Sequence, residues 1–269
     1  MDRDTWHRSF ADQGYLVVEN VLSQAEVAAL NAEAARICHD HGAELRPDGA
    51  VRFEDVLCLH FPHKLSGLMR DAMAHPGIAR ILTAIIGPNV KAMQSMMFVK
   101  NAGKPGQAWH QDEFYIPTRD RSLAGGWIAL DDATVENGCL WVLPGSHKPG
   151  ILWPMRPHAS DAFDAGQEAF GFPDQTPVPV EVKAGSLVFF NGYLLHRSHK
   201  NRSTGFRRAL VNHYMAAESL LPWNWDGRLG VMDDNRDIVM VAGADPYAWK
   251  GLADHTRPFL RRETAVGAN

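Results

Sequence analysis

The spacing of apolar residues changes near residue 90, from the three- and four-residue repeat of amphipathic helices to the alternating or continuous runs of β-strands. Ser23 and Glu26 have the capping-box spacing that begins a helix. The pattern therefore predicts helical support over residues 1–89 and core strands over roughly 90–217. The expected helices lie at 4–13, 23–41, 64–74 and 76–86, and the expected strands at 15–18, 91–99, 109–115, 126–131, 140–143, 178–182, 187–195 and 209–215, with an edge strand at 56–59.

Two segments have no clear period. Residues 149–177 are rich in proline and glycine, and a loop of this length inside a compact domain is usually a lid or a binding loop. We expect this loop, with the N-terminal helices, to form a wall of a substrate pocket. The tail at 218–269 scatters tryptophans among Asp, Gly and Pro, and we expect it to cover the barrel mouth or to form a subunit contact. Without internal repeats or a break in composition, residues 1–269 are predicted to form a single domain.

Composition is ordinary for a globular protein of 269 residues, with 45% hydrophobic and 22% charged residues. A net charge of −4 without a dense Lys/Arg run argues against nucleic acid or an anionic membrane as a partner. No apolar run approaches the length of a membrane span. Cys38, Cys58 and Cys139 are widely spaced, as in a protein with reduced thiols. We therefore expect a cytoplasmic protein with a small-molecule partner, and its oligomeric state stays open.

The candidate chemistry begins in the aromatic run at 109–115. On a strand, residues two apart point the same way, so His110 and Asp112 are expected to project from one face while Gln111 points away. One imidazole and one carboxylate are two-thirds of the 2-His-1-carboxylate facial triad of non-haem Fe(II) oxygenases. A His-x-Asp pair alone is common, so the metal hypothesis needs a second histidine downstream.

That second histidine is His196, which follows the apolar run at 187–195. A polar loop then leads to Arg207, which opens another alternating run eleven positions further on. A strand end, a loop and a returning strand are expected to place His196 and Arg207 on adjacent strands. An arginine beside such an iron suits a bidentate salt bridge to the distal carboxylate of 2-oxoglutarate.

These motifs together resemble the phytanoyl-CoA 2-hydroxylase family of Fe(II)/2-oxoglutarate dioxygenases. They are His110-Gln111-Asp112, the run from Asn137-Gly138-Cys139-Leu140 to Leu143-Pro144-Gly145-Ser146-His147-Lys148, and His196-x-Ser198 with Gly205-Phe206-Arg207. The resemblance covers roughly residues 10–217. It implies a mainly β protein with flanking helices, built on a double-stranded β-helix (jelly-roll, cupin-like) core.

The resemblance also implies roles for particular residues. His110, Asp112 and His196 would bind iron, and Arg207 would hold the carboxylate of 2-oxoglutarate. The cofactors would be Fe(II), 2-oxoglutarate and O2, and an unactivated C–H of a small molecule would be hydroxylated with release of succinate and CO2. Further contacts to 2-oxoglutarate would come from Ser198, Trp127, Met96 and, less directly, Gln111.

The sequence gives little information about the prime substrate. Position beside the predicted triad, or on neighbouring strands, gives as candidate contacts Trp109, Glu113, Phe114, Tyr115, Trp141, Asn191, Arg197 and His213. Glu113 and Arg197 would suit a polar or zwitterionic molecule, whereas the aromatic residues would suit a lipid-like or terpenoid one.

Two other functions are also compatible with the sequence. One is a catalytically reduced jelly-roll binding protein, which the complete ligand set opposes. The other is a cupin-type metalloenzyme that does not use 2-oxoglutarate, which Arg207 and Ser198 oppose. Family members with Gly or Ala at the position of Asp112 act as halogenases, so the carboxylate here favours hydroxylation.

Overall fold

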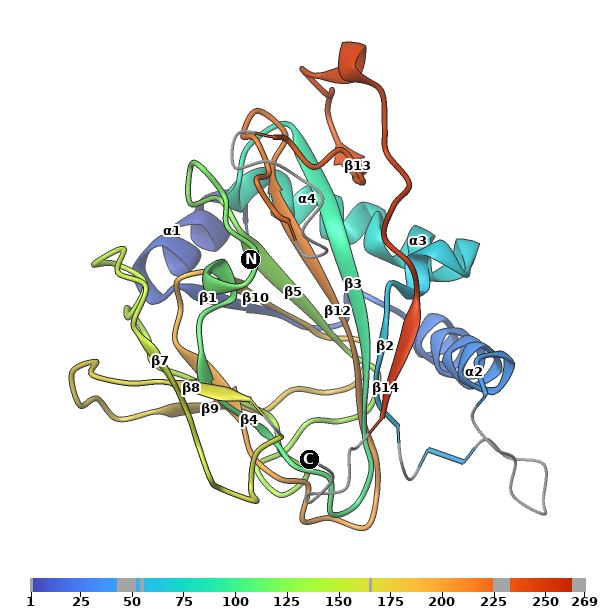
Figure 1. Cartoon of the computed structure of the whole chain (residues 1–269), viewed down its shortest axis with the longest axis vertical. Helices are drawn as coiled ribbons and strands as arrows, with labels where there is room; N and C mark the ends of the chain where they lie inside the picture. Colours follow the sequence, from blue (N-terminus) through green and yellow to red (C-terminus); the bar gives the residue numbers. More distant parts are fainter. Residues whose placement is uncertain (1, 43–51, 54–55, 165, 225–232, 263–269) are drawn as a thin grey trace.

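The computed structural model describes residues 2–42, 52–53, 56–164, 166–224 and 233–262 (Figure 1). Its helices confirm the N-terminal prediction, and the Ser23–Glu26 capping box forms as expected. The segment expected at 64–74 is interrupted, because Ser66 accepts a hydrogen bond from the Met69 amide and so starts a new helix. Among the described residues, no helix has both the length and the apolar character needed to cross a membrane. The helices are α1 (Arg3–Gln13), α2 (Gln24–Asp40), α3 (Gly67–Met73) and α4 (Pro76–Ile85), with 3-10 turns η1 (Pro62–Lys64), η2 (Asp112–Phe114) and η3 (Ala248–Lys250).

The strands form a large sheet, a small sheet and a hairpin, and all pairings within them are antiparallel. The large sheet has eight strands in the order β1-β10-β5-β12-β3-β2-β14, with β13 also paired to β3. The small sheet has the order β4-β11-β6-β9, and β7 pairs with β8. The strands are β1 (Tyr15–Val18), β2 (Val56–His60), β3 (Val90–Lys100), β4 (Gln107–His110), β5 (Ala124–Ala129), β6 (Leu140–Val142), β7 (Met155–Pro157), β8 (Gln167–Ala169), β9 (Val178–Val180), β10 (Leu187–Asn191), β11 (His196–Ser198), β12 (Arg207–Ala216), β13 (Val239–Ala242) and β14 (Phe259–Arg262).

Alternation along the large sheet divides the core into two layers. Ile128, Phe189 and Leu210 point outward into one buried cluster with the helices. Their neighbours along each strand, including Phe190 and Val211, point the other way and join a cluster with residues of the small sheet. In Figure 1, α2 and α3 lie on the right of the view and β7, β8 and β9 lie on the left. The two sheets face each other, and the expected jelly-roll with flanking helices is confirmed.

Two predicted strands differ from the structure, and the first of these differences affects the site. The run at 187–195 stays extended only to Asn191; Gly192 to Leu195 then turn, and His196 begins a strand of the other sheet. His196 and Arg207 therefore lie on different sheets that face each other, and not on adjacent strands as expected. The segment at 56–59 is not an edge, because β14 pairs with it on the outside.

The long loop and the tail both contain regular structure. The loop at 149–177 contains the hairpin β7–β8, and the tail contributes β13 and β14 to the large sheet. Trp249 of the tail is 80% exposed, and Trp225 lies outside the described residues. The tail thus becomes part of the barrel wall.

The buried His63 gives the fold a predicted pH dependence. Its Nδ1 lies 2.6 Å from Ser95 Oγ, and burial, followed by the charge of Lys64, lowers the pKa of His63 from 6.5 to about 4. The unfolded chain therefore takes up this proton first as the pH falls, so stability present at neutral pH is lost between pH 6.5 and pH 4. We expect His63 to remove about 2 kcal/mol of unfolding free energy between pH 7 and pH 5. In urea unfolding, the free energy of unfolding of His63→Asn should fall less between pH 7 and pH 5 than that of the unchanged protein. Equal decreases in the two proteins would show that His63 does not cause this pH dependence.

Candidate active site

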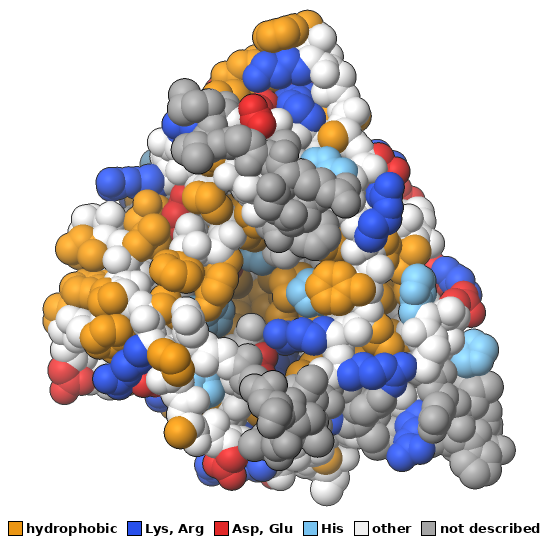
Figure 2. All heavy atoms as spheres, in the orientation of Figure 1, with side chains coloured by type: hydrophobic (Ala, Val, Ile, Leu, Met, Phe, Trp, Pro, Cys, Tyr) orange, Lys and Arg blue, Asp and Glu red, His pale blue; other side chains and the backbone are white. Residues whose placement is uncertain are grey.

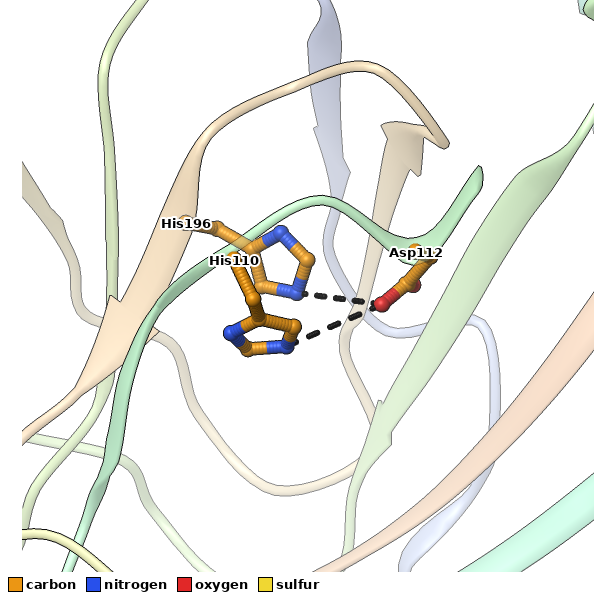
Figure 3. A group of neighbouring side chains, drawn as sticks. All are labelled: His110, Asp112 and His196. Carbon is orange, nitrogen blue, oxygen red and sulfur yellow. Dashed lines mark ion pairs between the residues drawn. The ribbon is translucent and has the colours of Figure 1, made fainter. Parts of the chain in front are cut away.

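Two histidines and one aspartate meet between the two sheets (Figure 3). His110 ends β4, Asp112 begins the turn η2, and His196 begins β11. One ligand atom from each lies within 4.8 Å of the others. Asp112 Oδ1 is 3.7 Å from His110 Nε2 and 3.6 Å from His196 Nε2. This is one of the arrangements in which three protein atoms bind one side of a metal ion and leave the other side open.

The pairing of β4 with β11 brings the two imidazoles together. His110 and His196 are direct partners in the register, and their ring centroids are 4.1 Å apart. Gly106 allows β4 to approach, because a Cβ there would lie 1.8 Å from the Ser198 carbonyl oxygen. The close backbone contact therefore depends on glycine just before the strand.

Asp112 reaches the site by a different route from the one predicted. The strand ends at His110, and Asp112 sits in a 3-10 turn in which its carbonyl accepts hydrogen bonds from Tyr115 N and Ile116 N. The turn, and not strand alternation, aims the carboxylate at the imidazoles.

Gln111 does point away from the site. Its side-chain amide donates to the carbonyls of Ile151 and Tyr193 and accepts from the Trp153 amide. This amide ties the long loop to the turn between β10 and β11, so its side-chain hydrogen bonds are made away from the cavity, and a contact of Gln111 with a co-substrate stays a prediction.

The protonation of the two imidazoles fits metal binding. Nδ1 of His110 donates to the Ala108 carbonyl at 2.8 Å, and Nδ1 of His196 donates to the Leu194 carbonyl at 3.0 Å. With the proton on Nδ1, each Nε2 carries a free lone pair towards the site. Burial, followed by the neighbouring His196, lowers the pKa of His110 to about 4, so its imidazole is neutral at neutral pH.

Asp112 is ionised in this environment. Burial alone would raise its pKa, but the neighbouring imidazoles of His196 and His213 and a hydrogen bond from His213 hold the pKa well below its usual range. His213 Nε2 donates to Asp112 Oδ2 at 2.9 Å, while Oδ1 faces the two other ligands. The carboxylate thus offers one oxygen to a metal and has the other one fixed.

His213 was predicted as a substrate contact, and its hydrogen bond to Asp112 leads us to expect that it positions this carboxylate. We expect His213→Phe to weaken Fe(II) or Co(II) binding by about 10- to 100-fold, because an unsupported carboxylate samples other rotamers. Isothermal titration with Co(II) measures this effect, and His213→Gln, which retains a donor, should recover part of the affinity. If His213→Phe binds Co(II) as tightly as the unchanged protein, His213 does not position Asp112.

The triad opens into a cavity of about 480 Å³ that also contains Arg207 and Trp127. Arg207 is 3% exposed, and its Cζ lies 5.4 Å from the centre of the Trp127 ring. Its Nε is buried with no hydrogen-bond partner in the described parts of the chain. Asp131, which lies nearby, has both carboxylate oxygens bonded to Arg208. Burial lowers the pKa of Arg207 to about 10, so the guanidinium remains charged at neutral pH. Because an uncompensated buried charge is destabilising, a buried guanidinium of this kind favours binding of an anionic ligand.

Ser198 lies beside this arginine in the cavity wall. Its Oγ accepts hydrogen bonds from Lys100 Nζ at 2.9 Å and from the Gln107 amide at 3.3 Å. Both lone pairs of the hydroxyl are therefore occupied, which leaves its proton to donate. Lys100 also donates to two backbone carbonyls, and burial, followed by the charge of Arg207, lowers its pKa.

The remaining predicted contacts divide into two groups. Met96, Tyr115, Arg197 and His213 line the cavity. Glu113 instead accepts hydrogen bonds from Thr118, and Asn191 accepts one from the Tyr193 amide. The predicted residues that are not among those lining the cavity are Trp109, Glu113, Phe114, Trp141 and Asn191.

Several lining residues were not anticipated from the sequence. Strand alternation gave a usable signal for β3, on which Gln94, Met96 and Phe98 all face the cavity. No local pattern marks Trp223 or Arg261, because the tail residues reach the cavity only through long-range packing.

A jelly-roll that gathers two imidazoles and a carboxylate beside a buried arginine, whose Nε has no hydrogen-bond partner among the described residues, fits the iron- and 2-oxoglutarate-dependent oxygenases. The family model for phytanoyl-CoA dioxygenase (PhyH) matches residues 10–209. The chain belongs to this family.

Named relatives support the same assignment. The chain is 34% identical over 248 residues to the phytanoyl-CoA dioxygenase of Arabidopsis thaliana, an alignment covering 78% of this chain and 87% of that one. It is 29% identical over 233 residues to the peroxisomal phytanoyl-CoA dioxygenase of Rattus norvegicus, covering 78% and 67%.

Solved structures share the fold. One is the non-heme alpha-ketoglutarate-dependent carbocyclase SnoK from nogalamycin biosynthesis, with 27% identity, a TM-score of 0.70, and coverage of 90% of this chain and 97% of that one. Another is the epimerase SnoN in complex with Fe3+, alpha-ketoglutarate and nogalamycin RO, with 22% identity, a TM-score of 0.67 and coverage of 86% and 93%. With its family and its His-Asp-His site, this chain is an Fe(II)/2-oxoglutarate-dependent oxygenase.

Proposed function

We propose that this oxygenase hydroxylates an unactivated C–H bond of a small molecule and releases succinate and CO2. The observation that carries the proposal is Arg207, a buried guanidinium that shares one cavity with the triad and whose Nε has no partner in the described residues. A dicarboxylate that bridges the metal side of the cavity and Arg207 would satisfy both groups.

In this proposal, His110, Asp112 and His196 hold Fe(II) through Nε2, Oδ1 and Nε2. The bound metal supplies the oxidising power for decarboxylation of 2-oxoglutarate and attack on the substrate C–H. Arg207 holds the distal carboxylate of 2-oxoglutarate with its planar fork, and Ser198 donates its hydroxyl proton to the same group. Trp127 and Met96 form the apolar sides of this pocket and exclude water from it.

The prime substrate lies in the rest of the cavity, where Tyr115 and Arg197 of the predicted contacts remain. Tyr115 is 48% exposed, so it stands at the cavity opening and is available to a ligand. We favour hydroxylation over halogenation because Asp112 occupies the position that a chloride ion would need. The names of SnoK and SnoN describe ring formation and epimerisation by those two enzymes, and product analysis distinguishes such outcomes here.

Two measurements test the proposed reaction. Anaerobic titration of the protein with Fe(II) and 2-oxoglutarate should give the weak visible charge-transfer band of a chelated keto acid. A metabolite-extract screen should then find compounds that stimulate succinate release only when 2-oxoglutarate is present. A protein that shows no such band, and no succinate with any fraction, would be a binding protein of the same fold.

Two further expectations belong to the same proposal. We propose that the chain forms one catalytic domain, since β1 and β14, from opposite ends of the chain, lie in the same sheet. We also propose a cytoplasmic location, which the three free, buried cysteines support. Fractionation of cells expressing the tagged chain tests the location.

A further inference from the structure

Part of the cavity wall is built by residues outside the part of the chain that the family model matches. Trp223 and Arg261 both line the cavity, and both follow the matched residues 10–209. Arg261 lies on β14, which pairs with the outer side of β2. Residues that differ from the shared framework are the ones expected to set which substrate enters.

Arg261 forms an ion pair across the cavity wall. Its guanidinium Nη2 lies 3.1 Å from Asp164 Oδ2, in the loop between β7 and β8. The Asp164 backbone is fixed by a hydrogen bond from its amide to the Gly106 carbonyl. Figure 2 shows a hollow at the centre of this face, with basic and acidic side chains close together at its edge. The pair therefore joins the tail to the long loop beside the cavity.

This ion pair does not occupy all the N–H donors of the Arg261 guanidinium. Only one contact joins Arg261 to Asp164, and Arg261 Nε is buried with no hydrogen-bond partner in the described part of the chain. The side chains of Arg261 and Asp164 are 36% and 17% exposed, so the pair is accessible to a ligand from the cavity. A guanidinium that has a free N–H donor and contacts only one carboxylate can bind a second anion, or can release the first carboxylate and bind another anion in its place.

The charges around the cavity favour an anion. When Fe(II) and 2-oxoglutarate are bound, the charges of the metal and Arg207 balance those of Asp112 and the dicarboxylate. Of the other charged residues that line the cavity, Arg197 and Arg261 are cationic and Asp164 is anionic. One positive charge is left over among the described lining residues. Arg197 Nε is also buried without a hydrogen-bond partner among these residues.

Another part of the cavity wall is apolar and aromatic. Trp223 packs with Phe61 at a ring-centroid distance of 6.4 Å, and Ile116 belongs to the same buried cluster. Ile116 and Trp223 both face the cavity. A ligand that satisfies these groups has an apolar or aromatic body and a single anionic group.

We propose that Arg261 is a specificity-determining residue that binds a carboxylate of the prime substrate in exchange for Asp164. This inference rests on the proposed oxygenase function and adds the class of substrate, an apolar or aromatic monocarboxylate. Asp164 holds the arginine in place before the substrate binds and competes with the substrate for it.

The test uses ω-phenylalkanoates from phenylacetate to 6-phenylhexanoate as probes, each beside its neutral primary amide. The full-length protein is saturated anaerobically with Fe(II) and 2-oxoglutarate, and probe binding is followed by tryptophan fluorescence and by the charge-transfer band. We expect at least one acid to bind more tightly than its amide. Arg261→Gln should weaken binding of that acid about tenfold or more and leave the amide within about twofold.

Three further variants make the result specific. Asp164→Asn removes the competitor and should tighten binding of the acid, and Arg261→Lys should retain part of the preference. Arg262→Gln removes the same charge from the next, exposed residue of β14, and should leave the preference unchanged.

Two results would overturn the inference. They are a series in which no acid binds more tightly than its amide, and an acid-to-amide ratio that Arg261→Gln does not change. Affinity for 2-oxoglutarate, measured first in every variant, separates this inference from the proposed function. Normal 2-oxoglutarate binding with an unchanged ratio rejects only the role of Arg261, whereas absent 2-oxoglutarate binding rejects the oxygenase proposal itself.

Discussion

Asp112→Ala is expected to abolish succinate formation at saturating Fe(II), 2-oxoglutarate and substrate. Asp112 is the only acid among the three described residues of the site, and it approaches both imidazoles through one oxygen. Its removal takes away a metal ligand and leaves His213 Nε2 without the acceptor at 2.9 Å. Since the loss of groups that merely orient a ligand costs 10- to 100-fold in metal affinity, the loss of the ligand itself should exceed that range. Co(II) titration and succinate release together measure both effects.

The adjacent Glu113 provides a matched control. Its carboxyl group is buried, but it accepts hydrogen bonds from Thr118 and does not line the cavity. Burial raises the pKa of Glu113 to about 7, so Glu113→Gln replaces a group that is already partly neutral at neutral pH. We expect Glu113→Gln to keep its Co(II) affinity and its succinate formation. If Asp112→Ala still binds Co(II) like the unchanged protein, the triad is not the metal site.

The sequence was sufficient for features that depend on neighbours along the chain. The helices α1 and α2 and the strand β1 were predicted closely, because apolar spacing and the Ser23–Glu26 box are local signals. His196 was found because it follows the apolar run at 187–195, and His110 because it lies beside Asp112 in the aromatic run at 109–115. The family resemblance supplied the jelly-roll, which periodicity alone does not specify.

The features that were missed depend on which strands pair. A four-residue turn after Asn191 moves His196 into the small sheet, and nothing in the apolar run at 187–195 marks that change of sheet. The place of β14 outside β2 is likewise a long-range pairing. Alternation on β12 does carry one signal, because Arg207 and His213 are an even number of residues apart and both face the cavity. The hydrogen bond from His213 to Asp112 required the position of η2, which only the folded chain provides.

Arg207→Ala is expected to raise the KM for 2-oxoglutarate and to leave turnover at saturating 2-oxoglutarate much less affected. Arg207 lines the same cavity as the three residues that could hold a metal but is not one of them. Its removal should therefore weaken binding of the co-substrate carboxylate without removing a metal ligand. Truncating one partner of a buried, hydrogen-bonded charge pair costs about 2–5 kcal/mol, so KM should rise by roughly 30-fold or more. Arg207→Lys keeps the positive charge but loses the two-pronged guanidinium. Its KM for 2-oxoglutarate should therefore lie between the values of the unchanged protein and of Arg207→Ala.

Arg208 is the control for this prediction because it follows Arg207 on β12 and faces the other way. Its guanidinium binds both oxygens of Asp131, outside the cavity. Arg208→Ala should therefore lower stability in urea unfolding while the KM for 2-oxoglutarate stays within about twofold. An anaerobic titration of the charge-transfer band checks binding separately from turnover. If Arg207→Ala retains the 2-oxoglutarate affinity of the unchanged protein, another group holds the distal carboxylate, and the unpartnered Nε of Arg207 serves a different anion.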